Sequence, residues 1–159
     1  MAKTTTTKKA ASTKTATKKI TSKNVLAMLK GKYDEVYNDG SVYCIKHNGK
    51  WGFADANGEI KIKPCFTGIG EEWIEDIIPT WGDGGIGFVN KKLKVIAKPQ
   101  FSRASDFRKG VATVMQKSGK WGLIDKTGKI VIPFVFDNIN FTSNGKIEAK
   151  IGSFIFVTK

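Results

Sequence analysis

Acidic and aromatic side chains gather in one short part of the sequence, residues 71–83. Two tryptophans stand there among five carboxylates: Trp73 and Trp81, with Glu71, Glu72, Glu75, Asp76 and Asp83. Paired carboxylates beside aromatic rings are the arrangement that hydrolyses glycosidic bonds. Without catalysis, exposed tryptophans would still offer a platform for a sugar or a peptide. The competing interpretation is a solvated connecting loop. The ligand-binding hypothesis rests on four side chains: Trp73, Trp81, Glu71 and Glu72.

Cys44, His47 and Cys65 carry the ligand atoms that zinc prefers. However, Cys44 and His47 flank a turn, and the sequence places no fourth ligand beside them. Two cysteines without a CxxC spacing imply no disulfide framework, so a reducing compartment is the default. The single histidine argues against a Ser-His-Asp triad, and no P-loop, GxGxxG, GxSxG or HExxH motif is present. We therefore expect a non-enzymatic protein with no catalytic residues, no metal and no cofactor.

The first 23 residues consist almost entirely of lysine, threonine, alanine and serine. They carry +7 of the formal net charge of +13 and contain no acid. Such a segment buries too little apolar surface to offset the entropy of ordering, so we predict a disordered tail. Its lysines are suited to salt-dependent contacts with nucleic acid or another polyanion: Lys3, Lys8, Lys9, Lys14, Lys18, Lys19 and Lys23. The alternative is a solubilising tail without a partner, and the absence of aromatic residues argues against base stacking.

The beginning of the sequence reads Lys-Thr-Thr-Thr-Thr-Lys-Lys after Met1 and Ala2, with no apolar run of the kind that a secretory leader needs. No stretch approaches the ~18 apolar residues that span a bilayer. We expect a protein of the cytoplasm, or of a phage or nucleoprotein particle, that does not contact a membrane.

A 35-residue period organises the rest of the chain. Gly-Lys-Trp-Gly at residues 49–52 recurs at residues 119–122, and each copy continues to an aspartate, a glycine and an Ile-x-Ile pair. Ile86 lies halfway between Trp51 and Trp121 and begins a more divergent copy. A fixed period of this length indicates a repeat architecture, in which stacked units bury a shared core.

Each copy predicts three short strands joined by two tight turns. In the first copy, β-branched and aromatic residues at 42–46, 51–55 and 60–63 are separated by Asn48-Gly49 and Asn57-Gly58. These dipeptides are typical of tight β-hairpins. The fold class is therefore all-β, with tandem antiparallel hairpin or meander repeats. Residues 22–31 predict one short helix, capped at Ser22 or Asn24 and ended by Gly31, which covers the first repeat.

Three details of the pattern lead to more specific expectations. Pro64 should end its strand because it has no N–H to donate. Leu93 stands where the other copies have a hairpin glycine, so we expect that turn to be looser or differently shaped. Residues 152–157 resemble the start of a fourth copy that is cut short.

The Gly-Lys-Trp-Gly-Phe/Leu-x-Asp-x-x-Gly-x-Ile-x-Ile unit resembles the WG-repeat family of bacterial proteins. The resemblance covers residues 40–157, and it implies tandem β-hairpin units that serve as binding or scaffolding modules. It supplies no catalytic residues. We accordingly divide the chain into a basic tail (1–23), a helix with its lead-in (24–39), and a β domain of three repeats plus a partial fourth (40–159).

Two functions fit this organisation. The first is a structural or adaptor protein that binds a protein partner through the β surface, with the tail on a polyanion. The second is a carbohydrate or cell-wall polymer module that uses the aromatic and acidic residues of the second repeat.

Overall fold

The computed structural model describes residues 21–158. Six of the seven lysines assigned to the basic tail lie outside this range. The prediction that the tail is disordered also concerns residues outside it. The seventh, Lys23, lies exposed on a helix.

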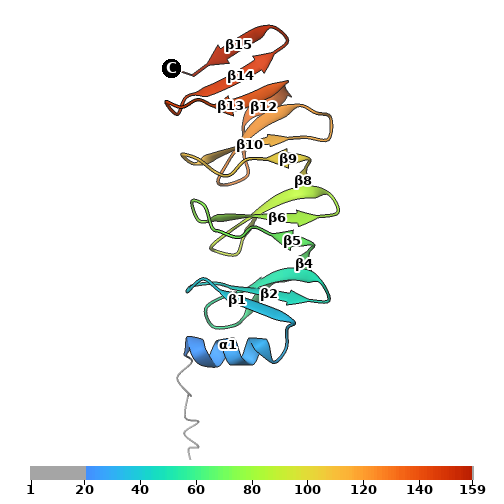
Figure 1. Ribbon diagram of the computed structural model, residues 1–159, viewed down its shortest axis with the longest axis vertical. Coiled ribbons are helices and arrows are strands. Elements are labelled where there is room, and N and C mark those ends of the chain that lie inside the picture. Colours follow the sequence, from blue (N-terminus) through green and yellow to red (C-terminus); the bar gives the residue numbers. More distant parts are fainter. Residues whose placement is uncertain (1–20, 159) are drawn as a thin grey trace, which may run out of the picture.

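The described chain is one helix followed by four antiparallel sheets stacked along one axis, with α1 at one end and β15 at the other (Figure 1). The helix α1 spans Ser22–Lys30. The first sheet contains β1 to β4 in order: Glu35–Asn38, Tyr43–His47, Lys50–Ala54 and Ile60–Phe66. The second contains β5 to β8: Gly68–Ile69, Ile77–Gly82, Gly85–Asn90 and Val95–Phe101. The third contains β9 to β12: Arg103–Ala104, Val111–Met115, Trp121–Asp125 and Ile130–Phe136. The last contains β13 to β15: Asn138–Phe141, Ile147–Ile151 and Phe154–Val157.

These sheets confirm the predicted all-β repeat class, with one correction. Each full unit has four strands rather than three, because a short strand (β1, β5 or β9) pairs ahead of the predicted meander. Two of these strands are only Gly68–Ile69 and Arg103–Ala104. Strands this short carry no alternating pattern of hydrophobic residues, and only the neighbouring strand defines them.

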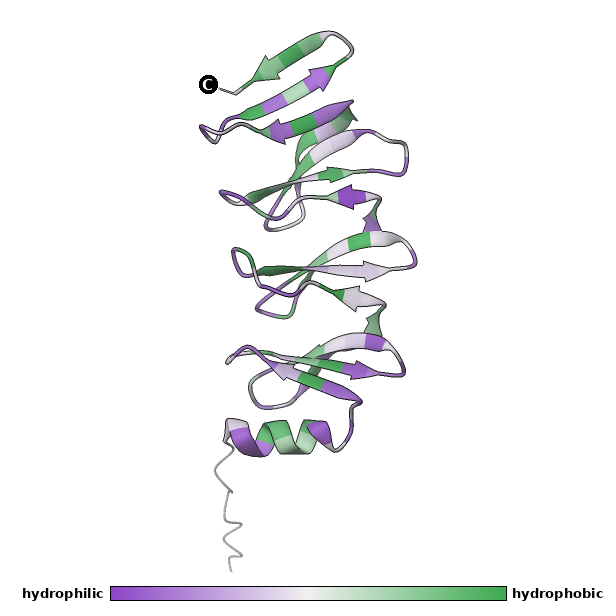
Figure 2. Cartoon of the chain, in the orientation of Figure 1, coloured by the Kyte–Doolittle hydropathy of each residue, from purple (hydrophilic) through white to green (hydrophobic). Residues whose placement is uncertain are grey.

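The helix covers the open face of the first sheet. Its side chains Val25 and Leu29 are buried in one cluster with Tyr43, Ile45 and Ala54 of that sheet. Figure 2 shows hydrophobic and hydrophilic residues alternating along α1. The cap is Thr21, not Ser22 or Asn24 as expected: its hydroxyl accepts a 3.4 Å hydrogen bond from the Asn24 N–H. A threonine oxygen placed there satisfies one of the free N–H groups at the start of the helix.

Successive sheets pack face to face, so the second and third sheets are each covered on both faces. Phe53, Phe66, Ile78 and Val89 form the core between the first two sheets. Phe88, Phe101, Val114 and Ile124 fill the next core, and Leu123, Ile139 and Ala149 lie in the last. In each unit, adjacent residues of the third strand therefore serve different cores, as Phe88 and Val89 do.

The pairing between the third and fourth strands repeats exactly with the period of the sequence. Trp51 lies opposite Phe66, Ile86 opposite Phe101, and Trp121 opposite Phe136. In each unit, the next pair of opposed residues lies two positions later in the third strand but four positions earlier in the fourth strand. Three residues of the fourth strand therefore bulge against one glycine.

This bulge corrects the expectation for Pro64. The strand β4 continues through Pro64 to Phe66, because a bulged residue needs no partner for the N–H that proline lacks. The bulge also explains the glycine of the repeated Trp-Gly pair. A Cβ atom on Gly87 would lie 2.5 Å from the Ala97 carbonyl oxygen and 2.6 Å from the Pro99 nitrogen.

The turn at Leu93 has the same shape as its glycine counterparts, so the expectation of a different turn is wrong. Leu93 adopts φ of 58°, and its N–H donates to the Asn90 carbonyl at 2.8 Å. The equivalent bond from Gly58 to Asp55 is 2.9 Å. The side chain of Leu93 packs against the core between the first two sheets, and this contact offsets the cost of a left-handed leucine.

None of the described helices is long and apolar enough to cross a membrane.

We predict that Gly87→Ala destabilises the protein by about 3 kcal/mol, because the new methyl group would meet backbone atoms that cannot move without breaking the bulge. The matched control is Gly119→Ala, where φ is 83° but no heavy atom lies within 4 Å of the added Cβ. That change should cost only about 1 kcal/mol of backbone strain. Urea unfolding measures both, and equal losses would contradict the role of the close approach.

Candidate functional site

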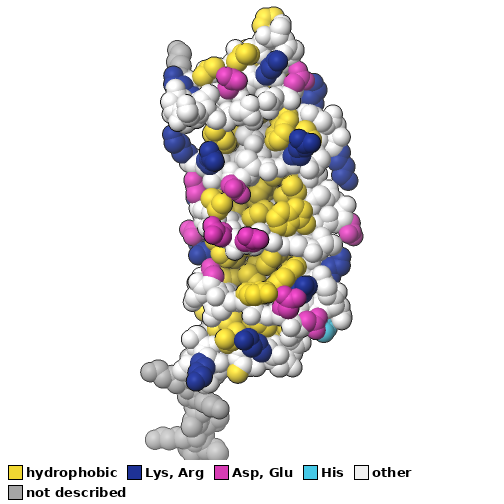
Figure 3. Space-filling model, viewed as in Figure 1, with side chains coloured by type: hydrophobic (Ala, Val, Ile, Leu, Met, Phe, Trp, Pro, Cys, Tyr) yellow, Lys and Arg dark blue, Asp and Glu magenta, His cyan; other side chains and the backbone are white. Residues whose placement is uncertain are grey.

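A cleft of about 400 Å³ opens between the first and second sheets. Its walls are mostly aromatic and apolar, and the lining comprises Tyr37, Asn38, Asp39, Cys44, Trp51, Ile69, Gly70, Glu71, Trp73 and Ile78. Figure 3 shows hydrophobic side chains gathered in hollows along the middle of one face of the stack, with charged side chains around them.

Three aromatic rings form the walls. Tyr37, at the end of β1, lies 5.6 Å from Trp51 of β3, with 32° between the ring planes. Trp73 lies in the segment between β5 and β6 and packs edge-on against Phe53 at 5.9 Å. The rings come from both sheets, so the cleft exists only because the two units stack.

Two lysines already lie over these rings. The Nζ of Lys46 is 5.1 Å from the centre of the Trp51 ring, and the Nζ of Lys91 is 5.8 Å from that of Trp73. Lys46 also pairs with Glu35 at 2.6 Å, and Glu35 accepts a 3.0 Å hydrogen bond from the Tyr37 hydroxyl. That hydrogen bond raises the pKa of Tyr37, so the phenol stays neutral. The aromatic walls therefore lie beside positive charge.

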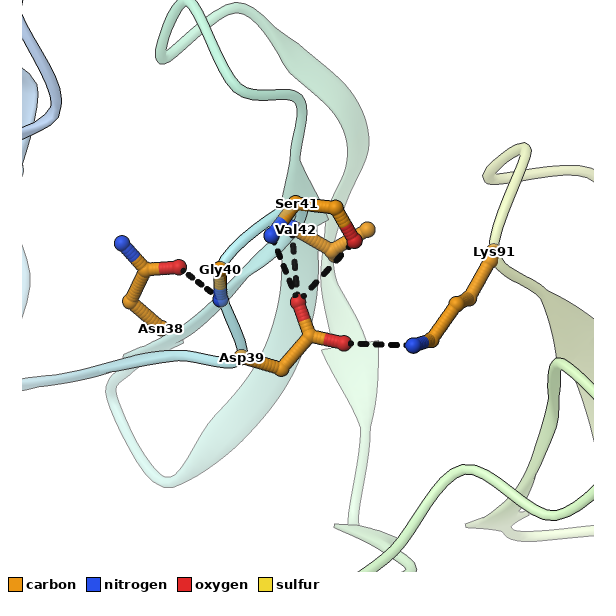
Figure 4. Close-up of polar contacts among 6 residues, drawn as sticks. All are labelled: Asn38, Asp39, Gly40, Ser41, Val42 and Lys91. Atoms are coloured by element: carbon orange, nitrogen blue, oxygen red, sulfur yellow. Dashed lines mark hydrogen bonds and ion pairs between the residues drawn. The ribbon is translucent and has the colours of Figure 1, made fainter.

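Asp39 holds the rim of the cleft together (Figure 4). One carboxylate oxygen accepts from the N–H groups of Ser41 and Val42 at 3.0 and 2.8 Å, and the other pairs with Lys91 at 3.1 Å. Partial burial would raise the pKa of Asp39, but these N–H donors and the lysine outweigh it and lower the pKa. With these contacts made, Asp39 is a structural residue of the rim rather than a free acid.

Cys44 lies on the cleft floor and is buried. Burial, reinforced by the nearby Asp39, raises the pKa of this thiol to about 11. It is therefore protonated at neutral pH and unsuited to nucleophilic attack or metal ligation. His47 points elsewhere and packs on Tyr33 at 6.0 Å. Residues 21–158 contain no group of three or more metal-ligating side chains.

The structure separates the residues that the sequence proposed as one binding site. Trp73 and Glu71 line the cleft, whereas Glu72 and Trp81 do not. Trp81 lies on β6, where its ring covers the backbone of Gly68. Glu75 belongs to a different contact, since it accepts from the Gly110 N–H at 2.9 Å and pairs with Lys126 at 3.0 Å.

Sequence reasoning misses two of the three aromatic rings that line the cleft. Tyr37 lies on a strand that the sequence does not predict, and Trp51 belongs to the repeated Trp-Gly pair, which indicates packing between units rather than a binding site. The sequence does contain a usable signal. Tyr37 stands two positions after an acidic residue, which is the spacing of side chains on one exposed face of a strand, and the turn Asn38-Asp39-Gly40 marks where that strand ends.

The model of the family described as "WG containing repeat" matches residues 51–79, 86–121 and 121–153. The chain belongs to the WG-repeat family. This membership confirms the resemblance seen in the sequence, and with the stacked sheets it indicates a repeat-based binding module.

Other comparisons add little to this WG-repeat protein. No curated protein matches it. Similar solved structures include the computationally designed Ika4 protein, at 10% identity and a TM-score of 0.40, with 77% of this chain and 88% of Ika4 covered. The computationally designed Ika8 protein has 10% identity and a TM-score of 0.38, with 72% of this chain and 41% of Ika8 covered.

Ion pairs join adjacent layers of the stack. Lys91 and Lys126, which are 35 positions apart, each reach back to a carboxylate of the preceding unit, Asp39 and Glu75 respectively. Hydrogen bonds from Lys126 and Gly110 lower the pKa of Glu75. Both carboxylates are thus ionised more readily in the folded chain than in the unfolded chain.

We predict that these ion pairs stabilise the fold at neutral pH. Their contribution should disappear as the pH falls through the lowered pKa values of the two carboxylates, which lie below 3.8 for Asp39 and below 4.5 for Glu75. The double variant Asp39→Asn, Glu75→Gln should lose less stability than the parent between neutral pH and pH ~3. Thermal melting across this range measures the difference. Glu72→Gln, at an exposed position, is the control and should follow the parent curve.

Proposed function

We propose that this WG-repeat protein is a non-enzymatic adaptor. Its stacked sheets offer a rigid surface to a protein partner, and its basic tail contacts nucleic acid or another polyanion. The observation that carries the proposal is the segregation of charge. The first 23 residues hold seven lysines and no acid, whereas residues 24–159 hold 20 basic and 14 acidic residues. Five lysines of the stack pair with its carboxylates.

The chemistry of the cleft supports a binding role rather than catalysis. Within the cleft, Asp39 is bound by Ser41, Val42 and Lys91, and Cys44 is held protonated. Outside the cleft, Glu75 pairs with Lys126. Glu71 is exposed and belongs to none of the ion pairs found within residues 21–158. A single free carboxylate falls short of the acid and base pair that glycoside hydrolysis requires.

We predict that deletion of residues 1–20 removes most of the affinity for nucleic acid and flattens its dependence on salt, because fewer counterions are released. The deletion spares Thr21 and the helix that it caps. Binding to duplex DNA and to single-stranded RNA, measured over a range of salt concentrations, tests this outcome. The control Lys63→Gln, Lys98→Gln removes two exposed charges from the stack and should leave the salt slope almost unchanged. Equal binding by the truncated chain would rule out the arm.

A second candidate function is the binding of a carbohydrate or cell-wall polymer in the cleft. Flat aromatic walls favour the apolar faces of a sugar ring. Hydrogen-bonding groups lie at the rim: Glu71 can accept, and Asn38, whose oxygen takes the Gly40 N–H at 2.6 Å, keeps its amide N–H groups to donate. The lysines over Trp51 and Trp73 disfavour a cationic ligand, which leaves neutral or acidic sugars as the class that fits best.

For this candidate, we predict that Tyr37→Ala and Trp73→Ala each weaken glycan binding by about tenfold or more, since each removes one stacking face. Trp81→Ala is the matched control because Trp81 is exposed but lies outside the cleft. A glycan array followed by calorimetry on any positive sugar gives the measurement. A blank array, or an equal loss with Trp81→Ala, would eliminate the cleft as a sugar site.

A further inference from the structure

Exposed hydrophobic side chains are concentrated at the end of the stack away from the helix. Of the eleven large hydrophobic residues that are exposed in the described chain, seven lie on β12 and β15: Ile130, Val131, Val135, Phe154, Ile155, Phe156 and Val157. Neither strand contains a charged residue. All four residues of β15 are hydrophobic (Figure 2), and among the strands of residues 21–158 it alone has every residue exposed. On a chain with a net charge of +13, such a patch marks an interaction site.

The other units protect the same edge with charge. Lys63 of β4 and Lys98 of β8 are both exposed, and the equivalent position of β12 holds Pro133. Lys61 of β4 is exposed too, but it corresponds to Ile96 of β8 and Val131 of β12. Lysines on edge strands disfavour contact with other chains. Neither β12 nor β15 contains a lysine, so the edges of the third and fourth units lack the charge that the first two have.

The outer edge of β15 is also open. This strand pairs with β14, and within residues 21–158 no strand pairs with its other side. The Thr158 N–H donates to the Ile147 carbonyl across β14. Because N–H groups alternate along a strand, those of Ile155 and Val157 point outward. In the first three units the corresponding edge is occupied by the fourth strand of the repeat.

A groove runs beneath this edge. It has a volume of about 250 Å³ and lies between β12 and β15, with Ile132, Pro133, Phe136, Phe156 and Val157 in its walls. Phe156 occupies the position 35 residues after Trp121, and its ring packs edge-on against Phe136 at 6.1 Å. Since β13 packs on β11 and β14 on β12, β15 projects past the third sheet, which leaves Phe154 70% exposed and Phe156 54% exposed.

We propose that the occupant of this edge is a second copy of the chain, joined through antiparallel pairing of β15 with β15. A two-fold axis that relates two antiparallel neighbouring strands is perpendicular to their sheet. With the axis at Phe156, Ile155 of one copy pairs with Val157 of the other, so the outward backbone groups of both residues are satisfied. The two end sheets become one continuous sheet of six strands.

This symmetry explains why β12 is apolar as well as β15. An axis perpendicular to the end sheet leaves both stacks on the same side of that sheet, with their β12 edges facing one another. A gap then separates the β12 strands of the two copies. The phenyl rings of Phe154 and Phe156 from both copies lie over this gap, and Val131 and Val135 line it. The lysines of β4 and β8 keep the remaining layers of these two basic bodies apart, so contact is confined to the uncharged end.

The first test is the mass of the 159-residue chain by sedimentation equilibrium, after nuclease treatment and at high salt to screen the tail. We expect twice the monomer mass. Ile155→Pro removes an N–H that points away from β14, so it blocks the new pairing and preserves the hairpin. It should weaken dimerisation by about tenfold or more, and so should Val131→Lys. The matched control Val95→Lys, on the edge strand of the second sheet where 37% of the residue is exposed, should remain dimeric.

Circular dichroism and thermal melting establish that each variant is folded. A second measurement tests the register directly: in a Cys65→Ser background, Phe156→Cys should form an intermolecular disulfide. In the proposed register the two Phe156 residues form a non-hydrogen-bonded antiparallel pair, whose Cα atoms lie about 4.5 Å apart. Phe154→Cys should cross-link much less. A monomeric parent chain, a dimer unaffected by Ile155→Pro, or equal disruption by Val95→Lys would overturn the proposal, as would capture of a different protein's strand by a monomeric chain.

Discussion

The close approach of one backbone to another, at the glycine after each tryptophan position, is the constraint on which the stack depends. At Gly52, Gly87 and Gly122 the fourth strand bulges by two extra residues and passes directly over the Cα. The bulge bends the strand out of its own sheet. Its end then reaches the level of the next layer, where the following unit begins within two residues. A side chain at the glycine would prevent this bend, and the units would no longer stack at a constant interval.

Much of the fold follows from the sequence for this reason. The 35-residue period, the turn glycines and the Trp-Gly pairs are local features, and they predicted the repeat, its hairpins and the helix that covers one end. The first strand of each unit was not predictable, because two or four residues such as Arg103-Ala104 adopt strand geometry only when a neighbouring strand supplies the hydrogen bonds. The turn at Leu93 shows the same dependence. Its backbone is set by packing in the core between the first two sheets, which no propensity of leucine indicates.

The candidate site lies where the repeats differ rather than where they agree. Trp73 is equivalent to Arg108 and Ser143 by the period of the sequence, and Tyr37 is equivalent to Glu72 and Phe107. Of these, Phe107 is buried against Phe88 at 5.2 Å. A wall of three aromatic rings can therefore form only at the first junction. The sequence pointed to Trp73 and Glu71 by composition, but the opposite wall comes from a strand more than thirty residues away that stacking alone brings near. Repetition provides the scaffold, and divergence at one junction forms the aromatic cleft.

The two ends of the stack solve the same problem in different ways. At the first sheet an apolar face remains, and α1 covers it with Val25 and Leu29. At the last sheet the register places Asn138, Asn140, Glu148 and Lys150 together on the face that points away from the third sheet. A largely polar face can remain in water, so no second helix is needed. The apolar part of this face is confined to the edge strand β15, where Ile155 and Val157 lie opposite Lys150 and Glu148. A helix covers a face through side chains alone, whereas an open strand edge also presents unpaired N–H and C=O groups. Another strand satisfies both requirements at once, and this is the physical basis of the pairing proposed for β15.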